Sequence, residues 1–517
     1  MMRRNKNLIP ILLEKDPTNC AVTAVAGMIP YLDFWNTLQM PQHIDRSVDI
    51  CGQQGWMDRQ MALSLVALNL AGGDCVTDIE KLEQDKGFCQ MFRAAEFADM
   101  NPQKRQMVAL RFRRKRNRTL PAPTQIHAFL EACHDESQEA KRQPGKAFIP
   151  IPNENLRALN SLNRHLAAEC QNRERHKTAT LDGDATLVAT QNQSALFCYK
   201  HYRAYQPYNI WWAEAQLVLT SEFRDGNVPA GFDILRVWKE ALCSLPDGIE
   251  QVFMRQDSAA YQNDIMAWCE RASEHPQYGR ILFTISADLS AALREAISQE
   301  REWTPLYRTR GGKQEKTNRE WAEVLFVSNN QALLSDIAEP FRYIAIRERA
   351  GDQLKLDLCE EGAVSSSGVP LVTMENVVYR VSALVTNRRD TPAEELIAWH
   401  YERCGKDEES HSIMKEDFAG GQLPSSKFGA NAAWWSLVIL SMNFASLLKR
   451  FVLGSAYVSS RMKAIRHALI NRAGRIVFHA RQFLLRVGAE FHSWLATLRE
   501  RAGSCVRYGS ERILSSG

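Results

Sequence analysis

The chain has 517 residues, of which 45% are hydrophobic and 24% are charged. These values are ordinary for globular proteins, predict two to four domains, and exclude disordered, collagen-like and low-complexity architectures. The formal net charge of +4 neither requires nor excludes a polyanionic partner.

The cysteines and the N-terminus indicate the compartment. The 12 cysteines are scattered from Cys20 to Cys505 without a Cys-x-x-Cys pair, which argues against a zinc ribbon or a thioredoxin-like site. The basic start MMRRNKN precedes only the apolar run LIPILL, whereas a signal peptide has an apolar core of about 7–15 residues. The sequence therefore predicts a reduced, cytoplasmic location.

The first hundred residues predict a small helical domain, which we assign to residues 1–98. Apolar residues recur at helical spacing in DRQMALSLVALNLAGGDCVTDIEKLEQDKGF. A basic linker follows at residues 99–123, where residues 111–118 hold six positive charges. Such a run is either a solvated linker or a phosphate-binding segment. The candidate phosphate contacts in it are Arg113, Arg114, Lys115 and Arg116.

Residues 124–288 predict the first part of a mixed α/β core. The segments KTATLDGDATLVAT, ALFCYKHYRAY and NIWWAEAQLVLTSEF indicate three successive strands. Helices at FDILRVWKEAL and AYQNDIMAWCERA then alternate with strands at IEQVFMRQD and GRILFTISAD. Three strands followed by helix, strand, helix, strand is the order of a ribonuclease-H-like mixed sheet.

The rest of the chain predicts an interrupted core. Extended segments such as FRYIAIRE and VVYRVSALVTN indicate a β-rich insertion at residues 289–386. The mixed core resumes at residues 387–455, and residues 456–517 form a basic tail that we expect to be helical. Of the segments in this part, residues 428–448 contain no charge and are long enough to span a bilayer. Asparagine, serine and glycine dilute their apolarity, which favours a buried core helix.

Carboxylates on the predicted strands suggest a metal site. Asp182 and Asp184 lie two residues apart on one strand and therefore face the same side of the sheet. Asp257 follows the fourth strand at its carboxyl end. A single aspartate at a strand end is more often a turn or a helix cap, but the joint placement favours ligands for Mg²⁺ or Mn²⁺.

A third carboxylate is expected in the segment YERCGKDEESHSIMK. On a helix Glu408, His411 and Lys415 share a face, whereas Glu409 points about 100° away. We therefore choose Glu408 as the third ligand. The alternative is a solvated charged face whose alignment is incidental.

At this point the residues resemble the DDE transposases of bacterial insertion sequences, most closely the insertion-sequence thirteen-eighty family. The resemblance runs from about residue 17 to residue 490 and includes LNLAGGDCVTDIEKL, LDGDAT, EFRDGN, RQDS and YERCGKDEESHSIMKED. The last block resembles the signature Tyr-x-x-Arg-x-x-x-Glu-(six residues)-Lys, with Tyr401, Glu408 and Lys415 in register. One departure is that Arg403 stands one residue early, because Cys404 occupies the arginine's place.

The resemblance implies a ribonuclease-H-like catalytic core in which Asp184, Asp257 and Glu408 hold two Mg²⁺ ions, which Mn²⁺ can replace. Asp182 is the alternative to Asp184. It further implies DNA contacts by Lys415, Arg403 and Tyr401, DNA binding by the N-terminal helical domain, and a homodimer assembled on double-stranded DNA. The DNA partners are the terminal inverted repeats and the target, and no membrane is expected.

Other function classes stay open or are disfavoured. The sequence has no Gly-x-x-x-x-Gly-Lys-Ser/Thr loop, so no nucleotide cofactor is expected. The alternatives are an inactive or domesticated DNA-binding derivative of a transposase, a ribonuclease-H-like nuclease, and a membrane-anchored protein of unrelated function.

Overall fold

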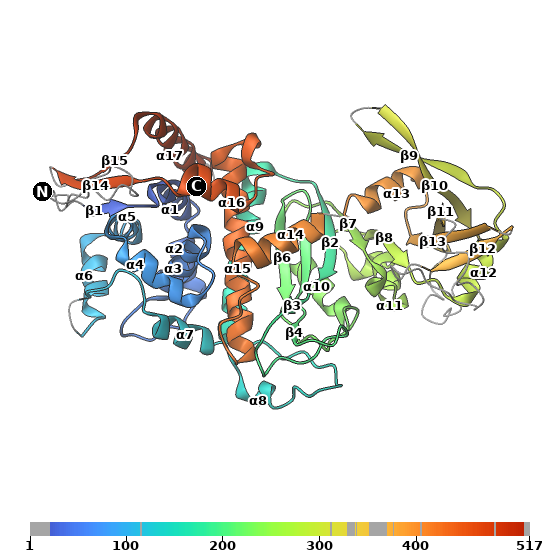
Figure 1. The fold of residues 1–517 in the computed structure, drawn as a ribbon, viewed down its shortest axis with the longest axis horizontal. Coiled ribbons are helices and arrows are strands. Elements are labelled where there is room, and N and C mark those ends of the chain that lie inside the picture. Colours follow the sequence, from blue (N-terminus) through green and yellow to red (C-terminus); the bar gives the residue numbers. More distant parts are fainter. Residues whose placement is uncertain are drawn as a thin grey trace, which may run out of the picture.

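The computed structural model describes residues 21–113, 116–310, 313–327, 337, 339–350, 370–375, 377–403, 406–479 and 482–510. Figure 1 shows three parts along the longest axis: a helical body that also contains the last elements of the chain, a central sheet region and a β-rich region.

Short helices make up the N-terminal part, as expected for residues 1–98, but they continue through the segment predicted as a linker at residues 99–123. They are α1 (Ile29–Thr37), α2 (Met40–Ser47), α3 (Asp58–Ala71), α4 (Ile79–Gln84), α5 (Lys86–Glu96), α6 (Pro102–Leu110), α7 (Pro123–Glu131) and α8 (Glu136–Glu139). Side-chain caps set three of their starts, because Asp85, Asn101 and Asp135 accept hydrogen bonds from the amides of Phe88, Lys104 and Ser137. Helix α3 ends at Gly72, which has a φ of 89°.

The central sheet is mixed, as expected from the sequence. Its strands are β2 (Thr178–Ala185), β5 (Tyr208–Trp212), β6 (Leu217–Glu222), β7 (Gln251–Gln256) and β8 (Leu282–Ala287). They lie in the order β6-β5-β2-β7-β8, with β2, β7 and β8 parallel and β5 and β6 antiparallel. Helices α9 (Glu154–Glu174), α10 (Ile234–Ser244) and α11 (Asn263–Glu270) connect to these strands.

One predicted strand is wrong. The segment ALFCYKHYRAY is mostly a loop between the two-residue strands β3 (Val188–Ala189) and β4 (Ala204–Tyr205). The segment NIWWAEAQLVLTSEF instead supplies both β5 and β6, which are joined by a turn at Gln216 with a φ of 54°. Aromatic composition predicts a strand in the first segment, but three of its aromatic residues, Phe197, Tyr199 and Tyr202, are exposed rather than packed on a sheet.

The β-rich insertion extends the central sheet. Helix α12 (Ala291–Gln299) precedes β9 (Thr304–Arg310), β10 (Lys313–Val324), β11 (Arg342–Arg349), β12 (Leu371–Met374) and β13 (Val377–Thr386). Strand β13 pairs antiparallel with β8, so β11, β10 and β9 continue a sheet of ten strands. Helix α13 (Ala393–Tyr401) follows directly.

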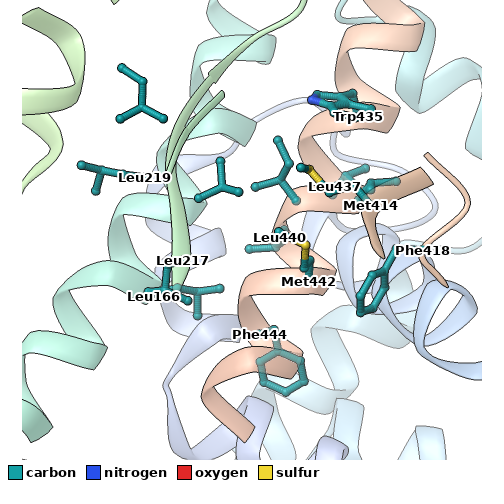
Figure 2. Packing of buried hydrophobic residues seen from close by; sticks show 14 of the residues in the cluster. Leu166, Leu217, Leu219, Met414, Phe418, Trp435, Leu437, Leu440, Met442 and Phe444 are labelled. Atoms are coloured by element: carbon teal, nitrogen blue, oxygen red, sulfur yellow. The ribbon is translucent and has the colours of Figure 1, made fainter. Parts of the chain in front are cut away.

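The uncharged stretch is the core helix of the molecule. Helix α15 (Phe428–Leu448) follows α14 (Lys406–Ser412) and a π-helical turn (Ile413–Asp417), and every residue of α15 is buried. Figure 2 shows its side chains packed between Leu166 of α9, Leu217 and Leu219 of β6, and the helices of the N-terminal part. Among the described residues, Phe428–Leu453 is one helix long and apolar enough to cross a membrane, and the bent pair Asp58–Ala71 and Val76–Gln84 passes the same test together. Its complete burial shows that α15 is covered by protein on all sides.

The C-terminal part is not the all-helical tail that we expected. After α16 (Met462–Ile465) it contains the hairpin β14 (Gly474–His479) and β15 (Gln482–Arg486), followed by α17 (Ala489–Ser510). Strand β14 pairs with β1 (Ala21–Thr23), which lies near the other end of the chain. Local periodicity does not predict such a distant pairing. Several basic side chains of this part bind the protein itself, including Arg450 on Glu174, Arg461 on Asp417 and Arg499 on Asp33.

Candidate carboxylate site

The carboxyl ends of β2 and β7 bring two of the predicted ligands side by side. The parallel register pairs Asp182 with Arg255 and Gly183 with Gln256, so one further residue places Asp184 next to Asp257. Neighbouring strands lie about 4.8 Å apart, and residues in register face the same side. The Asp184 side chain is 26% exposed, and the Asp257 carboxylate accepts a hydrogen bond from the Ala259 amide at 3.1 Å.

Asp182 lies in different surroundings. Both of its carboxylate oxygens accept hydrogen bonds from the Arg255 guanidinium at 2.7 Å, and the two side chains are 1% and 2% exposed. Burial raises the pKa of Asp182, and the charge of Arg255 opposes that shift. Because a metal at Asp182 would have to displace Arg255, this pairing supports Asp184 as the first ligand.

Arg255 also joins the strands to the helix before the third carboxylate. It donates a hydrogen bond to the Trp399 carbonyl at 2.8 Å and lies 3.4 Å from the Glu402 carboxylate, both in or next to α13. Its guanidinium stacks over the Trp399 ring, 5.0 Å from the centroid. One buried arginine therefore links β2, β7 and α13.

Helix α14 lies over this edge of the sheet. The His411 ring contacts Asp184, with 3.8 Å between Nδ1 and Oδ2, and its Nε2 lies 3.4 Å from the Asn209 amide nitrogen. One turn further along the chain, the Lys415 ammonium donates a hydrogen bond to the Thr186 hydroxyl at 3.2 Å. The face of α14 that we selected from the helical period is therefore the face that meets the sheet.

Glu408 belongs to α14, one turn before His411. Its side chain lies outside the described residues, so its assignment as the third ligand stays a prediction. The neighbouring Glu409 is exposed. The backbone of α14 and the contacts of His411 thus support the choice of this helix.

Burial controls the charge of the groups on this helix. It lowers the pKa of His411 to about 4, and the nearby charges of Lys415 and Arg403 act in the same direction. The imidazole is therefore neutral at pH 7 and contacts Asp184 as a dipole rather than as a cation. Burial also lowers the pKa of Lys415.

Asn209 is a site residue that sequence reasoning missed. It pairs with Asp184 across the antiparallel strands, and its side-chain oxygen accepts a hydrogen bond from Ser221 at 2.6 Å. Ser221 in turn accepts one from the Trp435 indole at 3.0 Å. This connects the core helix α15 to His411 and Asp184, a link made by residues far apart in sequence.

Two other predicted DNA contacts do not lie on the open surface. Arg403 is 9% exposed, and its charge is close enough to Asp182 and His400 to affect their pKa values. The Tyr401 hydroxyl lies 3.5 Å from Ser382 of the insertion, and the ring packs against the insertion's apolar cluster. Neither contact brings Tyr401 to the aspartates.

The residues of the basic segment 111–118 differ in their exposure. Arg116 makes two 2.8 Å hydrogen bonds with the Glu96 carboxylate and lies over the Trp56 ring at 5.0 Å. Arg113 is exposed, and Arg114 and Lys115 lie outside the described residues. One of the predicted DNA contacts, Arg116, therefore stabilises the fold through an ion pair with Glu96.

A second group of ligand-type side chains is less suited to a cation. Among the described residues, Cys170, Glu174 and His176 bring one ligand atom each within 4.8 Å of one another. However, the guanidinium of Arg450 already binds the Glu174 carboxylate. This positive charge disfavours a metal ion there.

Two comparisons with known proteins found matches. The family model described as "Transposase DDE domain group 1" matches residues 53–500. A solved structure, "piggyBac transposase synaptic complex with hairpin DNA", is similar at 8% identity over 94% of this chain and 81% of that chain, with a TM-score of 0.36. No curated protein matches the sequence.

Proposed function

The chain belongs to the transposases of DDE domain group 1, and from that membership we propose that it cuts DNA at the terminal inverted repeats of an insertion sequence and joins the ends to target DNA. The observation that carries this proposal is the placement of Asp184 beside Asp257, with α14 and its Glu408 over the same sheet edge. The strand order β6-β5-β2-β7-β8 is that of a ribonuclease-H-like core and supports it further. Membership of the insertion-sequence thirteen-eighty family rests on the motif resemblance.

The donor set fits a hard divalent cation. Asp184, Asp257 and Glu408 would hold Mg²⁺, with Mn²⁺ as a substitute, because all three offer carboxylate oxygen. The fit is better at Asp184 than at Asp182, whose two oxygens are already bound by Arg255. When bound, such ions activate the attacking oxygen and stabilise the leaving oxygen in phosphodiester hydrolysis and transesterification.

The chain's own groups orient the reactants. Neutral His411 packs against Asp184 and fixes the carboxylate from the side of α14. Lys415, held by Thr186, places a positive charge beside the carboxyl end of β2, where it would bind a phosphate near the scissile bond. The reaction needs no covalent enzyme intermediate, so no nucleophilic side chain is required.

DNA contacts would come from exposed cations. Arg113 is exposed and would bind backbone phosphates together with Arg114 and Lys115. Arg116, which pairs with Glu96, and Arg403, which is buried elsewhere near Asp182, would add positive charge from within the fold rather than bind phosphates directly. Synapsis of two element ends further requires a homodimer on DNA, and we place the reaction in the cytoplasm, at the nucleoid.

A cleavage assay on the element's own ends tests this function. The substrate is duplex DNA that carries the inverted repeats flanking the coding region. We expect strand cuts with free 3′-hydroxyls only with Mg²⁺ or Mn²⁺, and their loss in Asp184→Asn, Asp257→Asn and Glu408→Gln. Cutting that ignores the repeats would instead indicate a nuclease, and end-binding without cutting would indicate an inactive derivative.

A further inference from the structure

The loop between β3 and β4 presents aromatic side chains to solvent. Phe197, Tyr199 and Tyr202 are 56%, 69% and 37% exposed. Aromatic residues of this size are normally well buried, and three within six residues form a surface that ordinary packing does not explain. We call residues 196–203 the aromatic loop.

Basic side chains alternate with these rings. The guanidinium of Arg203 lies 4.7 Å from the centre of the Phe197 ring, and the ammonium of Lys200 lies 5.6 Å from that of Tyr199. Lys200 and His201 are exposed. The surface therefore combines flat aromatic faces with positive charge, a combination that suits single-stranded nucleic acid.

The tip of the loop is a tight turn. The Cys198 amide donates a hydrogen bond to the Tyr202 carbonyl, and the His201 amide donates one to the Cys198 carbonyl, both at 2.9 Å. His201 has a φ of 61°, a left-handed conformation that is uncommon for a non-glycine residue. Cys198 itself is buried, so the rings on either side of it are turned outward.

The base of the loop is fixed to the catalytic core. Arg142 donates to the Ser194 carbonyl at 2.9 Å and forms a buried ion pair with Asp225 at 2.7 Å. The backbone of Gly226 lies so close that an added Cβ would come within 3.1 Å of Cys198. The rings are thus held in place before any partner arrives, which reduces the entropy lost on binding.

The loop follows the strand that carries Asp184. Strand β3 begins three residues after β2 ends, and Thr186 between them receives the hydrogen bond from Lys415. Figure 1 shows β3 and β4 below β2, toward the lower end of the sheet. The aromatic loop therefore extends from the same sheet edge as the carboxylates.

We propose that the aromatic loop binds unpaired DNA bases beside the cleavage site, with Tyr199 and Phe197 stacking on bases and Lys200 binding the backbone. The inference rests on the proposed function, which makes DNA the substrate. In a duplex the base faces are covered by their neighbours, whereas a displaced or terminal base offers a free face to a ring. The loop would accordingly distinguish opened DNA ends from closed duplex.

Equilibrium binding of the full chain to a short single strand containing a fluorescent purine analogue tests this proposal, in EDTA so that no cleavage is needed. Stacking quenches the analogue. The double variant Phe197→Leu/Tyr199→Leu keeps apolar bulk but removes the rings, and we expect its single-strand affinity to fall roughly 5- to 100-fold, with quenching lost. A matched control is Phe478→Leu, which changes a ring that is 63% exposed on β14, in another sheet.

The outcomes separate this inference from the proposed function. Unchanged single-strand affinity and quenching in the double variant would overturn the stacking proposal, even if end cleavage proceeds. Loss of quenching in the double variant, with duplex affinity retained, would support it even in a chain that cannot cleave. Lys200→Met should reduce single-strand affinity and lower the slope of its salt dependence by about 0.7.

Discussion

The two halves of the strand pair β2–β7 place aspartates in opposite surroundings: the inner half holds Asp182 and Arg255, and the outer half holds Asp184 and Asp257. In the inner half Asp182 and Arg255 neutralise each other and are almost completely buried. Two residues further, Asp184 and Asp257 lie at the partly exposed sheet edge, where a cation can reach them from solvent. The comparison teaches that burial and pairing, not residue type, separate a structural aspartate from a candidate ligand.

The largest stability effect should come from breaking the inner pair. Arg255→Met leaves Asp182 buried without its partner, and we expect it to lower the free energy of unfolding by about 3–5 kcal/mol. Urea denaturation measures this change. The double variant Asp182→Leu/Arg255→Met removes both charges and should recover most of the loss. A single variant as stable as the wild type would show that the pair does not hold the strands.

The basic segment allows a second comparison, between the buried cation of Arg116 and the exposed cation of Arg113. Arg116→Gln leaves Glu96, which is 2% exposed, without its main partner, and should cost about 1.5–3 kcal/mol of unfolding free energy. Arg113→Gln is the matched control, because Arg113 is exposed; it should change stability by less than about 0.5 kcal/mol. Thermal and urea unfolding of both variants decide the comparison. Equal effects would contradict the division of roles.

Acid should destabilise the protein through a buried histidine near the inner pair. Burial lowers the pKa of His400 to about 3, and the charges of Arg403 and Arg255 add to the shift. Above the unfolded-state pKa of about 6.5, neither state is protonated and nothing is lost. Below it only the unfolded chain gains the proton, so stability falls with pH, by about 2 kcal/mol at pH 5, until the folded pKa is reached.

This pH effect is measured as the free energy of unfolding from urea titrations between pH 7 and pH 4. His400→Gln keeps a polar side chain near Thr284 and Ser286, which contact the ring at 2.9 Å and 3.1 Å. The variant should show a shallower decline than the wild type. Identical pH profiles would assign the acid sensitivity to other groups.

The smallest expected effect is on the cleavage rate and comes from changing the hydrogen-bond partner of Lys415, beside Asp184 and Asp257. Thr186→Val removes the hydroxyl that receives the Lys415 hydrogen bond while preserving shape. We expect the single-turnover cleavage rate to fall roughly 3- to 10-fold, which corresponds to about 1 kcal/mol. Affinity for end DNA, measured separately, should change less. An unchanged rate would show that Thr186 does not position Lys415.

Much of the catalytic frame was predictable from the sequence. Period and composition indicated β2, β7, their connecting helices and the core helix α15, because these elements bury apolar faces at regular spacing. The choice of Asp184 and Asp257 as joint ligands followed from their positions on the first and fourth predicted strands. The choice of the α14 face followed from the helical period and agrees with the contacts of His411.

Other features depend on pairings between distant segments. No local pattern indicates that Arg255 binds Asp182 and the Trp399 carbonyl, or that Asn209 lies between Ser221 and His411. The sequence predicts a helical tail where the structure has the hairpin of β14 and β15. The prediction relied on the basic residues of the tail, which do not indicate strands. The segment of the aromatic loop is predicted as a strand because aromatic residues favour strands. Its amino-acid composition does not show whether those residues are exposed or buried.

The proposed function depends most directly on metal binding by Asp184 and Asp257, the outer half of the strand pair. Mn²⁺ affinity of the full chain, measured by electron paramagnetic resonance without DNA, tests it independently of cleavage. We predict that Asp184→Asn and Asp257→Asn each weaken the tightest binding by at least about 10-fold, whereas Asp74→Asn, at an exposed acid elsewhere, leaves it unchanged. Wild-type Mn²⁺ affinity in both site variants would contradict the assignment of these two aspartates as metal ligands.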